Sequence, residues 1–392
     1  FTANITDANL FALNIDKSDP DLRASCYLIA NARGNSVNTL NGEIKLLNSL
    51  FTKKDKQLQI YDISVLSENA SGYSRITLRS DMMDAEMKGT YELTRIGDAV
   101  RYFVYTYLPS LADSTVLKTA IPNHSLELTA TIKNAKPVLD FFLPGYSIAE
   151  NSQVNLTYLP ESQNIRMSLQ TPKLIAKGIT WNNLNMLMEG NNDSLDLEAG
   201  GKNLILGKKL TLENFTLYSD IGQDKAGLRI RWNNWQDLQY KGDIRAMGKI
   251  SRQQGNRFPH FDISLYPARI VTNDTLWTIN PGEIRIDSTH IVFDNLVINH
   301  GNEYFKLDGT LSELSSDKMN ILFHRFNLAN LNGIAATSGY KLGGVLNGNA
   351  SVSDIYRNTL FTSLLKIDSL MINNEMLGNA QISSKWDNDR KA

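Results

Sequence analysis

The stretch that decides the fold of this chain is Ile291-Val292-Phe293-Asp294-Asn295-Leu296-Val297-Ile298. Its apolar residues alternate at odd positions up to Phe293, meet two polar residues, and then alternate again at even positions. Because successive side chains of a β-strand point to opposite faces, the buried face would change sides unless the strand bulges or turns a corner at Asp294-Asn295. The sequence therefore predicts a strand that is re-aimed here, so that Phe293 and Leu296 face the same interior.

The same pattern occurs elsewhere in the chain, which indicates one structural unit used repeatedly. Composition would give the asparagine form roughly once or less, against three found. Asn183, Asn214 and Asn295 occupy the same slot of the pattern, and Arg325 takes it in a fourth copy. The further copies are Ile179–Met186, Leu210–Leu217 and Ile321–Leu328, and Ile230–Trp235 carries the first half.

A second repeat places a glycine between polar neighbours and apolar flanks, on the same strand face as the flanks. Composition would give roughly one or two copies. The five found are Leu40–Ile44, Met87–Tyr91, Tyr240–Ile244, Leu307–Leu311 and Leu346–Ala350. Two interpretations are open. A missing side chain on the inner face lets a sheet bend toward that face, or the glycine makes room for a large neighbour. Together with the re-phasing corners, the first interpretation predicts a sheet rolled into a trough.

Most of the remaining chain alternates with the period of a half-buried strand. A helix is predicted over Thr94–Leu108, where Thr94 caps the start, Pro109 ends the helix, and the apolar residues form one stripe. A shorter helix is predicted at Pro137–Leu143 and a third around Leu328–Leu331. We therefore predict a mainly β fold: an elongated, curved antiparallel β-groove of the β-taco type, with two or three short amphipathic helices.

Length, charge and composition narrow the class of protein. The chain has 392 residues, a formal net charge of -1 and one cysteine, Cys26. The balanced charge argues against a nucleic-acid partner, and no apolar run reaches the roughly 18 residues of a membrane-spanning helix. No linker composition marks a boundary, so we expect residues 1–392 to form one continuous groove segment with no independent second domain. The helix at 94–108 would pack on that groove.

The motifs of common enzymes are missing, so we expect no catalytic activity and no cofactor. Two weaker alternatives concern ligands. His290 and His300 could meet across a hairpin and bind a metal with Asp287 or Asp294, although solvated histidines on a wet face explain them more simply. The tryptophans could form a sugar platform, although Trp181 and Trp232 occupy inward positions of the repeat.

Several segments resemble the AsmA-like superfamily, and within it the TamB translocation and assembly module family. The resemblance rests on Tyr340–Ser351 with its flanking segments, on Gly89–Leu93 leading into the predicted helix, and on Ile284–Leu311. It implies a long concave β-groove with an apolar interior, located in the periplasm between two bacterial membranes. It also implies a middle segment of a longer protein, anchored in the inner membrane by a part outside this sequence. Phospholipid acyl chains and an outer-membrane β-barrel would be its partners.

The physical argument agrees, because two or three helices cannot cover the apolar face of some twenty strands. We therefore expect a groove that shields lipid acyl chains for phospholipid transport between the inner and outer membranes. The residues predicted to line it are Trp181, Leu212, Phe215, Trp232, Phe293, Leu296, Leu307 and Leu311. Two alternatives are a scaffold that assembles outer-membrane proteins by β-augmentation, and an all-β adhesin or glycan-binding protein.

Overall fold

β-strands dominate both of the compact units into which the chain divides. The computed structural model describes residues 1–70, 72–111, 125–159, 164–207, 210–234, 240–252, 258–272, 274–314, 316–332, 340–354 and 360–385. The first unit comprises Phe1–Thr106 and Ser114–Lys208, and the second Tyr107–Asp113 and Lys209–Ala392. Among the described residues, all strand pairs are antiparallel and two segments are α-helices, which confirms the predicted mainly β class. The groove shape and its continuity over both units stay predictions.

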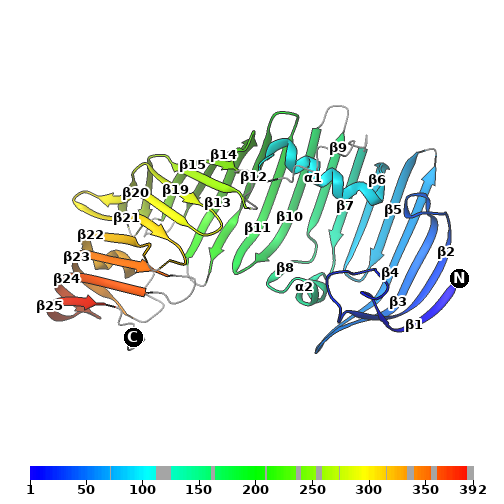
Figure 1. Cartoon of the computed structure of the whole chain (residues 1–392), viewed down its shortest axis with the longest axis horizontal. Coiled ribbons are helices and arrows are strands. Elements are labelled where there is room, and N and C mark those ends of the chain that lie inside the picture. The colour runs from blue at the N-terminus through cyan, green and yellow to red at the C-terminus, as the bar shows by residue number, and fades with distance from the viewer. Residues whose placement is uncertain are drawn as a thin grey trace. The chain divides into compact units, whose positions relative to one another are not determined.

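The strands of the first unit follow one another across its sheet, with β8 inserted at one place (Figure 1). β9 pairs with residues 164–170 of β10, and β8 pairs with residues 174–176 on the same side. The strands are β1 (Thr2–Asn9), β2 (Arg23–Arg33), β3 (Asn41–Lys53), β4 (Lys56–Ala70), β5 (Tyr73–Ser80), β6 (Met83–Thr90), β7 (Ser125–Ile132), β8 (Tyr146–Ile148), β9 (Gln153–Leu159), β10 (Asn164–Ala176), β11 (Ile179–Gly190) and β12 (Leu195–Leu206).

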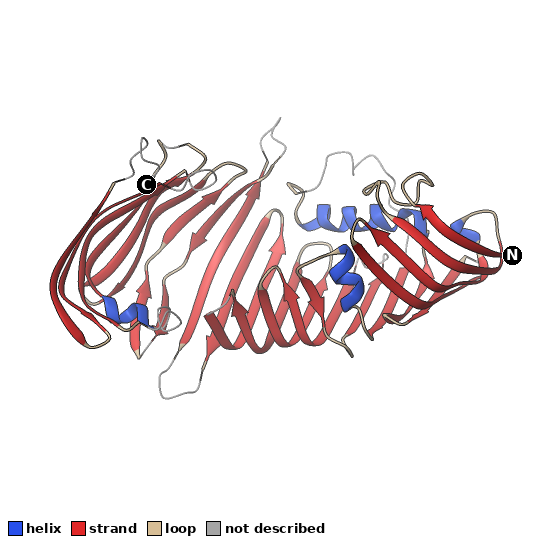
Figure 2. Cartoon of the chain, turned by 90° about the horizontal axis from the view of Figure 1, so that it is seen from below, coloured by secondary structure: helices blue, strands red, loops and turns tan. Residues whose placement is uncertain are grey.

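Both predicted α-helices are present, and Figure 2 shows them beside the strands of the first unit. α1 (Ile96–Tyr107) follows a 3-10 turn, Leu93–Arg95, and α2 (Lys136–Phe142) has a proline in its first turn, where no intrahelical N–H is needed. Phe141 anchors α2 in a buried cluster with Leu22, Leu58 and Ile60. The third predicted helix, at Leu328–Leu331, is a single 3-10 turn.

The second unit continues the antiparallel pattern with two interrupted strands. Tyr266-Pro267 separates β16 from β17 and Asn280-Pro281 separates β18 from β19, because proline lacks the N–H that a ladder needs. The strands are β13 (Leu210–Gly222), β14 (Lys225–Asn233), β15 (Lys241–Ser251), β16 (His260–Leu265), β17 (Ala268–Thr272), β18 (Thr275–Ile279), β19 (Gly282–Ile286), β20 (Ile291–His300), β21 (Glu303–Leu311), β22 (Met319–Asn327), β23 (Leu342–Ser353), β24 (Leu360–Ile372) and β25 (Glu375–Ser384).

The asparagine slot of the repeat has a left-handed backbone in every full copy. The φ angles are 51° at Asn183, 46° at Asn214, 53° at Asn295 and 48° at Arg325. Asparagine tolerates this region better than most residues because its short side chain can hydrogen-bond locally. The repeat therefore marks a position where the backbone must adopt a left-handed conformation, as predicted for a corner or bulge.

The bulge in β20 places Phe293 and Leu296 on one face, as predicted. Phe293 lies opposite Gly309 and Leu296 opposite Leu307, so that Asp294 and Asn295 together face the single residue Asp308. The N–H of Asn295 donates to the carboxylate of Asp308 over 3.0 Å. The N–H of Arg325 likewise donates to Asn347 over 2.7 Å. The bulge leaves one backbone N–H without a partner in the strand ladder, and a polar side chain on the next strand accepts a hydrogen bond from that N–H.

Four glycines of the repeat lie close to the backbone of a neighbouring strand, and the fifth lies against a large side chain. At Gly42, Gly89, Gly309 and Gly348 the φ angle lies between 121° and 145°, and an added Cβ would collide with a carbonyl oxygen of the neighbouring strand. At Gly242 the added Cβ would meet the ring of Trp232 instead. The first four match the close approach of a bent sheet, whereas Gly242 makes room for a large neighbour.

Candidate functional site

One face of the first unit carries rows of apolar side chains that run across its strands. Residues directly opposite each other in an antiparallel pair share a face, so the strand register assigns each row. A central row consists of Ile44, Val65, Leu78, Ala85, Ala130, Val154, Leu169, Met186 and Ala199. A second row consists of Ile76, Met87, Leu128, Leu156, Met167, Met188 and Leu197. We call these two rows together the apolar face.

The opposite face of the same strands carries the charges. Three ion pairs illustrate it: Lys88 with Glu127 at 2.9 Å, Arg166 with Glu189 at 2.7 Å, and Arg79 with Asp84 at 2.9 Å. Each of these residues lies one position along its strand from a member of the apolar face. Within the described part of β4–β7, of β9, of β10 up to Thr171, of β11, and of β12 up to Ala199, no Lys, Arg, Asp or Glu lies at a position of the apolar face. The two faces are therefore separated by charge as sharply as the strand period allows.

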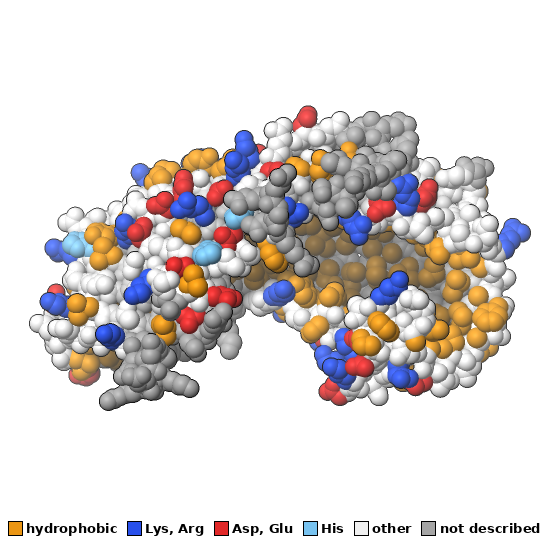
Figure 3. All heavy atoms as spheres, viewed as in Figure 1, with side chains coloured by type: hydrophobic (Ala, Val, Ile, Leu, Met, Phe, Trp, Pro, Cys, Tyr) orange, Lys and Arg blue, Asp and Glu red, His pale blue; other side chains and the backbone are white. Residues whose placement is uncertain are grey.

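Most side chains of the apolar face are only half-buried. In the central row, Ala130, Leu169 and Ala199 are buried and the others retain part of their exposure. Figure 3 shows a hollow in the first unit lined by hydrophobic side chains. The central row crosses nine strands and extends about 38 Å, because neighbouring strands lie about 4.8 Å apart. The protein thus leaves a long apolar surface incompletely covered.

The two helices stand at different places along this surface. α2 packs beside β3, where the ring of Phe142 meets Phe51 edge to face with ring centres 6.3 Å apart. α1 stands near Tyr158 of β9, where burial raises the pKa of the Tyr158 phenol and the neighbouring Tyr102 raises it further.

Seven of the eight predicted lining residues lie in the second unit. Phe293, Leu296 and Leu307 pack together in the second unit around Ala268 and Ile279, which confirms their common face. Trp232 lies opposite Gly242, and Leu311 lies opposite Ile291 and is buried. Leu212 and Phe215 flank the left-handed Asn214 of β13, and Phe215 is buried.

Trp181 is the only predicted lining residue in the first unit. It lies opposite Leu174 of β10 and Leu204 of β12. At this end of the three strands the apolar residues occupy the alternate positions, one residue out of step with the two rows of the apolar face. The change occurs without a register shift, unlike the bulge at Asn295. Trp235, the last residue of the partial copy Ile230–Trp235, lies outside the described residues.

Sequence reasoning missed the apolar face itself as a site. Its residues alternate regularly, as in Val154-Asn155-Leu156-Thr157-Tyr158, and such alternation predicts a strand without distinguishing a covered face from an open one. The available signal was the number of alternating strands against the small number of helices. The excess of strands over helices indicates that an apolar surface stays uncovered. Which residues form its rows follows only from the strand register.

The histidine pair weighed as a metal site does not form. His290 precedes β20 and His300 ends it, so the two side chains stand at opposite ends of one strand, about 33 Å apart. His300 instead lies 2.8 Å from the carbonyl oxygen of Leu276, and its ring stands beside Trp277. Asp294-Asn295 forms a bulge within the strand. A hairpin turn at this place would have been needed to bring His290 and His300 together.

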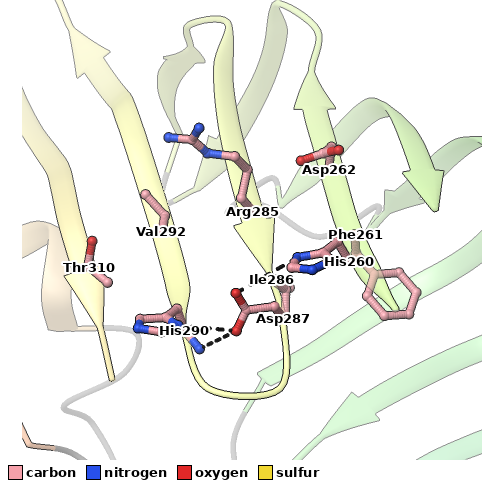
Figure 4. Close-up of a pocket in the computed structure, with 9 residues that line it drawn as sticks. All are labelled: His260, Phe261, Asp262, Arg285, Ile286, Asp287, His290, Val292 and Thr310. Atoms are coloured by element: carbon pink, nitrogen blue, oxygen red, sulfur yellow. Dashed lines mark hydrogen bonds and ion pairs between the residues drawn. The ribbon is translucent and has the colours of Figure 1, made fainter. Parts of the chain in front are cut away.

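His290 belongs to a different cluster, together with His260 and Asp287, at a pocket of about 390 Å³ in the second unit (Figure 4). Asp287 lies 3.3 Å from His290 and 3.8 Å from His260. Burial raises the pKa of Asp287, but the N–H groups and side chains of Thr289 and His290 donate to its carboxylate and lower the pKa to about 2. This is the hydrogen bonding of an Asx turn, which fixes the hairpin between β19 and β20.

Two further observations concern ligands and membranes. Among the described residues, no group of three or more His, Cys, Asp or Glu side chains could hold a metal ion. None of the helices in the described part of the chain is long and apolar enough to cross a membrane.

Comparisons with known proteins return no relative. No protein-family model matches the chain, and neither the curated proteins nor the solved structures contain a match.

Proposed function

We propose that this chain shields lipid acyl chains along its apolar face, and that it does so for phospholipid transport between the inner and outer membranes of a bacterial envelope. The single observation that carries the proposal is the apolar face of the first unit, which is uncharged, half-exposed and hollowed. An apolar side chain that becomes fully buried contributes about 1.5 to 3 kcal/mol, so a long uncovered face favours an apolar occupant.

The chemistry of the face favours hydrocarbon over a peptide as that occupant. The backbone N–H and C=O groups of β4–β7 and β9–β11 are engaged in ladders with both neighbouring strands. The side chains of the apolar face offer no charge and almost no hydrogen-bonding group. A peptide laid on this face would leave its own polar groups unpaired, at a cost of some kcal/mol for each group, whereas an acyl chain has none to pair.

The proposed envelope location rests on the resemblance to the TamB family. The net charge of -1 gives no electrostatic reason for a nucleic-acid partner, but it does not bear on the compartment. The single cysteine fits a cytosolic protein and a periplasmic protein without disulfides equally, so it does not decide the compartment. The chain would act in the periplasm, and an outer-membrane β-barrel would be its partner.

Lipid extraction of the purified chain followed by mass spectrometry tests the proposal. We expect phospholipid to co-purify at a ratio of about one or more molecules per chain, as a site of this size implies. A preparation free of lipid that also takes up none from vesicles would contradict the proposal. Capture of unfolded outer-membrane strands by such a preparation would then favour the scaffold alternative, and glycan binding would favour the adhesin.

A further inference from the structure

Three methionines form a patch on the apolar face of the first unit. Met167 of β10 lies directly opposite Met188 of β11, and Met186 lies two residues away on the same face of β11. All three side chains are half-buried. Sheets favour β-branched and aromatic residues, which pack well on a pleated surface, so strand propensity does not explain three neighbouring methionines.

The surroundings of the patch leave these side chains room to move. Met186 lies opposite the small Ala199 of β12, and Gly190 ends the same strand beyond Met188. A methionine side chain is unbranched, has three rotatable bonds, and adapts to surfaces of irregular shape. By contrast, the apolar cluster of the second unit around Ala268 and Ile279 consists of isoleucine, leucine, alanine and phenylalanine.

We infer that the patch of Met167, Met186 and Met188 gives the lipid site a broad choice of acyl chains. Cis-unsaturated and branched chains are kinked or widened, and they need a wall that changes shape with the occupant. The flexible methionines provide such a wall, so kinked and straight chains bind with similar affinity. This inference rests on the proposed function, because it concerns the selectivity of the same site.

The test replaces the methionines by stiff side chains that suit a strand. Delipidated wild-type protein and the variant M167I/M186I/M188I are incubated with vesicles containing equal amounts of a phosphatidylethanolamine with straight saturated chains and one with cis-unsaturated chains. Bound lipids are extracted and quantified by mass spectrometry. We expect the wild type to bind both lipids within a factor of about two, and the variant to shift the ratio about threefold or more toward the saturated lipid.

The matched control is M247I/M319I/M371I, which makes the same three changes at half-buried strand positions of the second unit, outside the apolar face, and its ratio should stay at the wild-type value. If the triple variant does not fold, M188I alone serves, with a smaller shift in the same direction. A variant that binds lipid at the wild-type ratio overturns the inference and leaves the proposed function standing. So does a wild type that takes up one lipid almost exclusively. Binding of neither lipid by the wild type overturns both.

Discussion

Gly309 shows how strictly one position can constrain the sequence. Its φ is 121°, and an added Cβ would collide with the carbonyl oxygen of Lys318, the residue that precedes β22. We expect Gly309→Ala to lower the free energy of unfolding by about 3 kcal/mol, because both the backbone conformation and the neighbouring strand oppose it. Urea unfolding followed by circular dichroism measures this loss.

Gly301 provides the control, because its φ of 55° is also positive but an added Cβ would have no atom within 4 Å. Gly301→Ala should therefore cost only about 1 kcal/mol, the conformational part of the effect. Equal losses in the two variants would show that the close approach of β22 to Gly309 has no energetic weight.

Asp287 links the stability of the second unit to pH. Its pKa is about 2 in the folded chain and 3.8 for the unperturbed group, so the folded state favours the ionised carboxylate. Its contribution is complete above pH 4 and is lost as the pH falls from about 4 to 2. We expect Asp287→Asn to lower the free energy of unfolding by about 1 to 2 kcal/mol at pH 7 and by almost nothing near pH 2. A loss of equal size at both pH values would contradict this.

The sequence predicted the residues that need a special backbone better than it predicted their partners. Asn183, Asn214 and Asn295 were recognisable because few residues tolerate a left-handed φ, and the repeat displays the requirement directly. Asp308, which receives the N–H of Asn295, was not recognisable, because it belongs to the next strand and its position depends on the register. The same limit applies to Asp287 and His260, whose contact depends on the pairing of β16 with β19.

At the scale of elements, the alternation of apolar and polar residues predicted the strands and their faces. Residues that begin or end a helix predicted the limits of the helices. Thr94 and Pro109 predicted the limits of α1 to within two residues. Pro267 and Pro281 were recognisable in the sequence as residues that interrupt a strand, but the resulting strand arrangement was not predictable. Each proline splits one line of the sheet into two collinear strands, and this arrangement follows from the pairing of both halves with the same neighbours.

The adjacent strands β7 and β9 supply a pair of variants that separates the two faces of the sheet. Leu128 lies opposite Leu156 on the apolar face, and Thr129 lies opposite Asn155 on the charged face. The double variants L128E/L156E and T129E/N155E therefore each place two glutamates opposite each other on the same two strands. T129E also lies opposite Glu86 of β6, so the charged-face variant meets at least as much cross-strand repulsion as the apolar-face variant. A loss of lipid confined to L128E/L156E therefore reports the face and not the repulsion.

At the scale of the whole molecule, the sequence predicted the mainly β class because strand periodicity is strong over most of the chain. Six of the eight predicted lining residues belong to the corner repeat, and Leu307 and Leu311 belong to the glycine repeat; seven of the eight lie in the second unit. The apolar face of the first unit was not chosen, because a regular strand gives no sign of being uncovered. The function is a property of many strands together, and no single motif encodes it.

The measurement that tests the lipid proposal most directly is the phospholipid content of L128E/L156E compared with that of T129E/N155E, determined by mass spectrometry on protein with wild-type circular dichroism. Two carboxylates on the apolar face should reduce bound lipid about tenfold or more, because hydrocarbon beside an ionised group forfeits its favourable burial. The same carboxylates on the charged face should leave bound lipid at the wild-type level. Equal lipid content in the two variants would contradict the proposal that acyl chains lie on the apolar face.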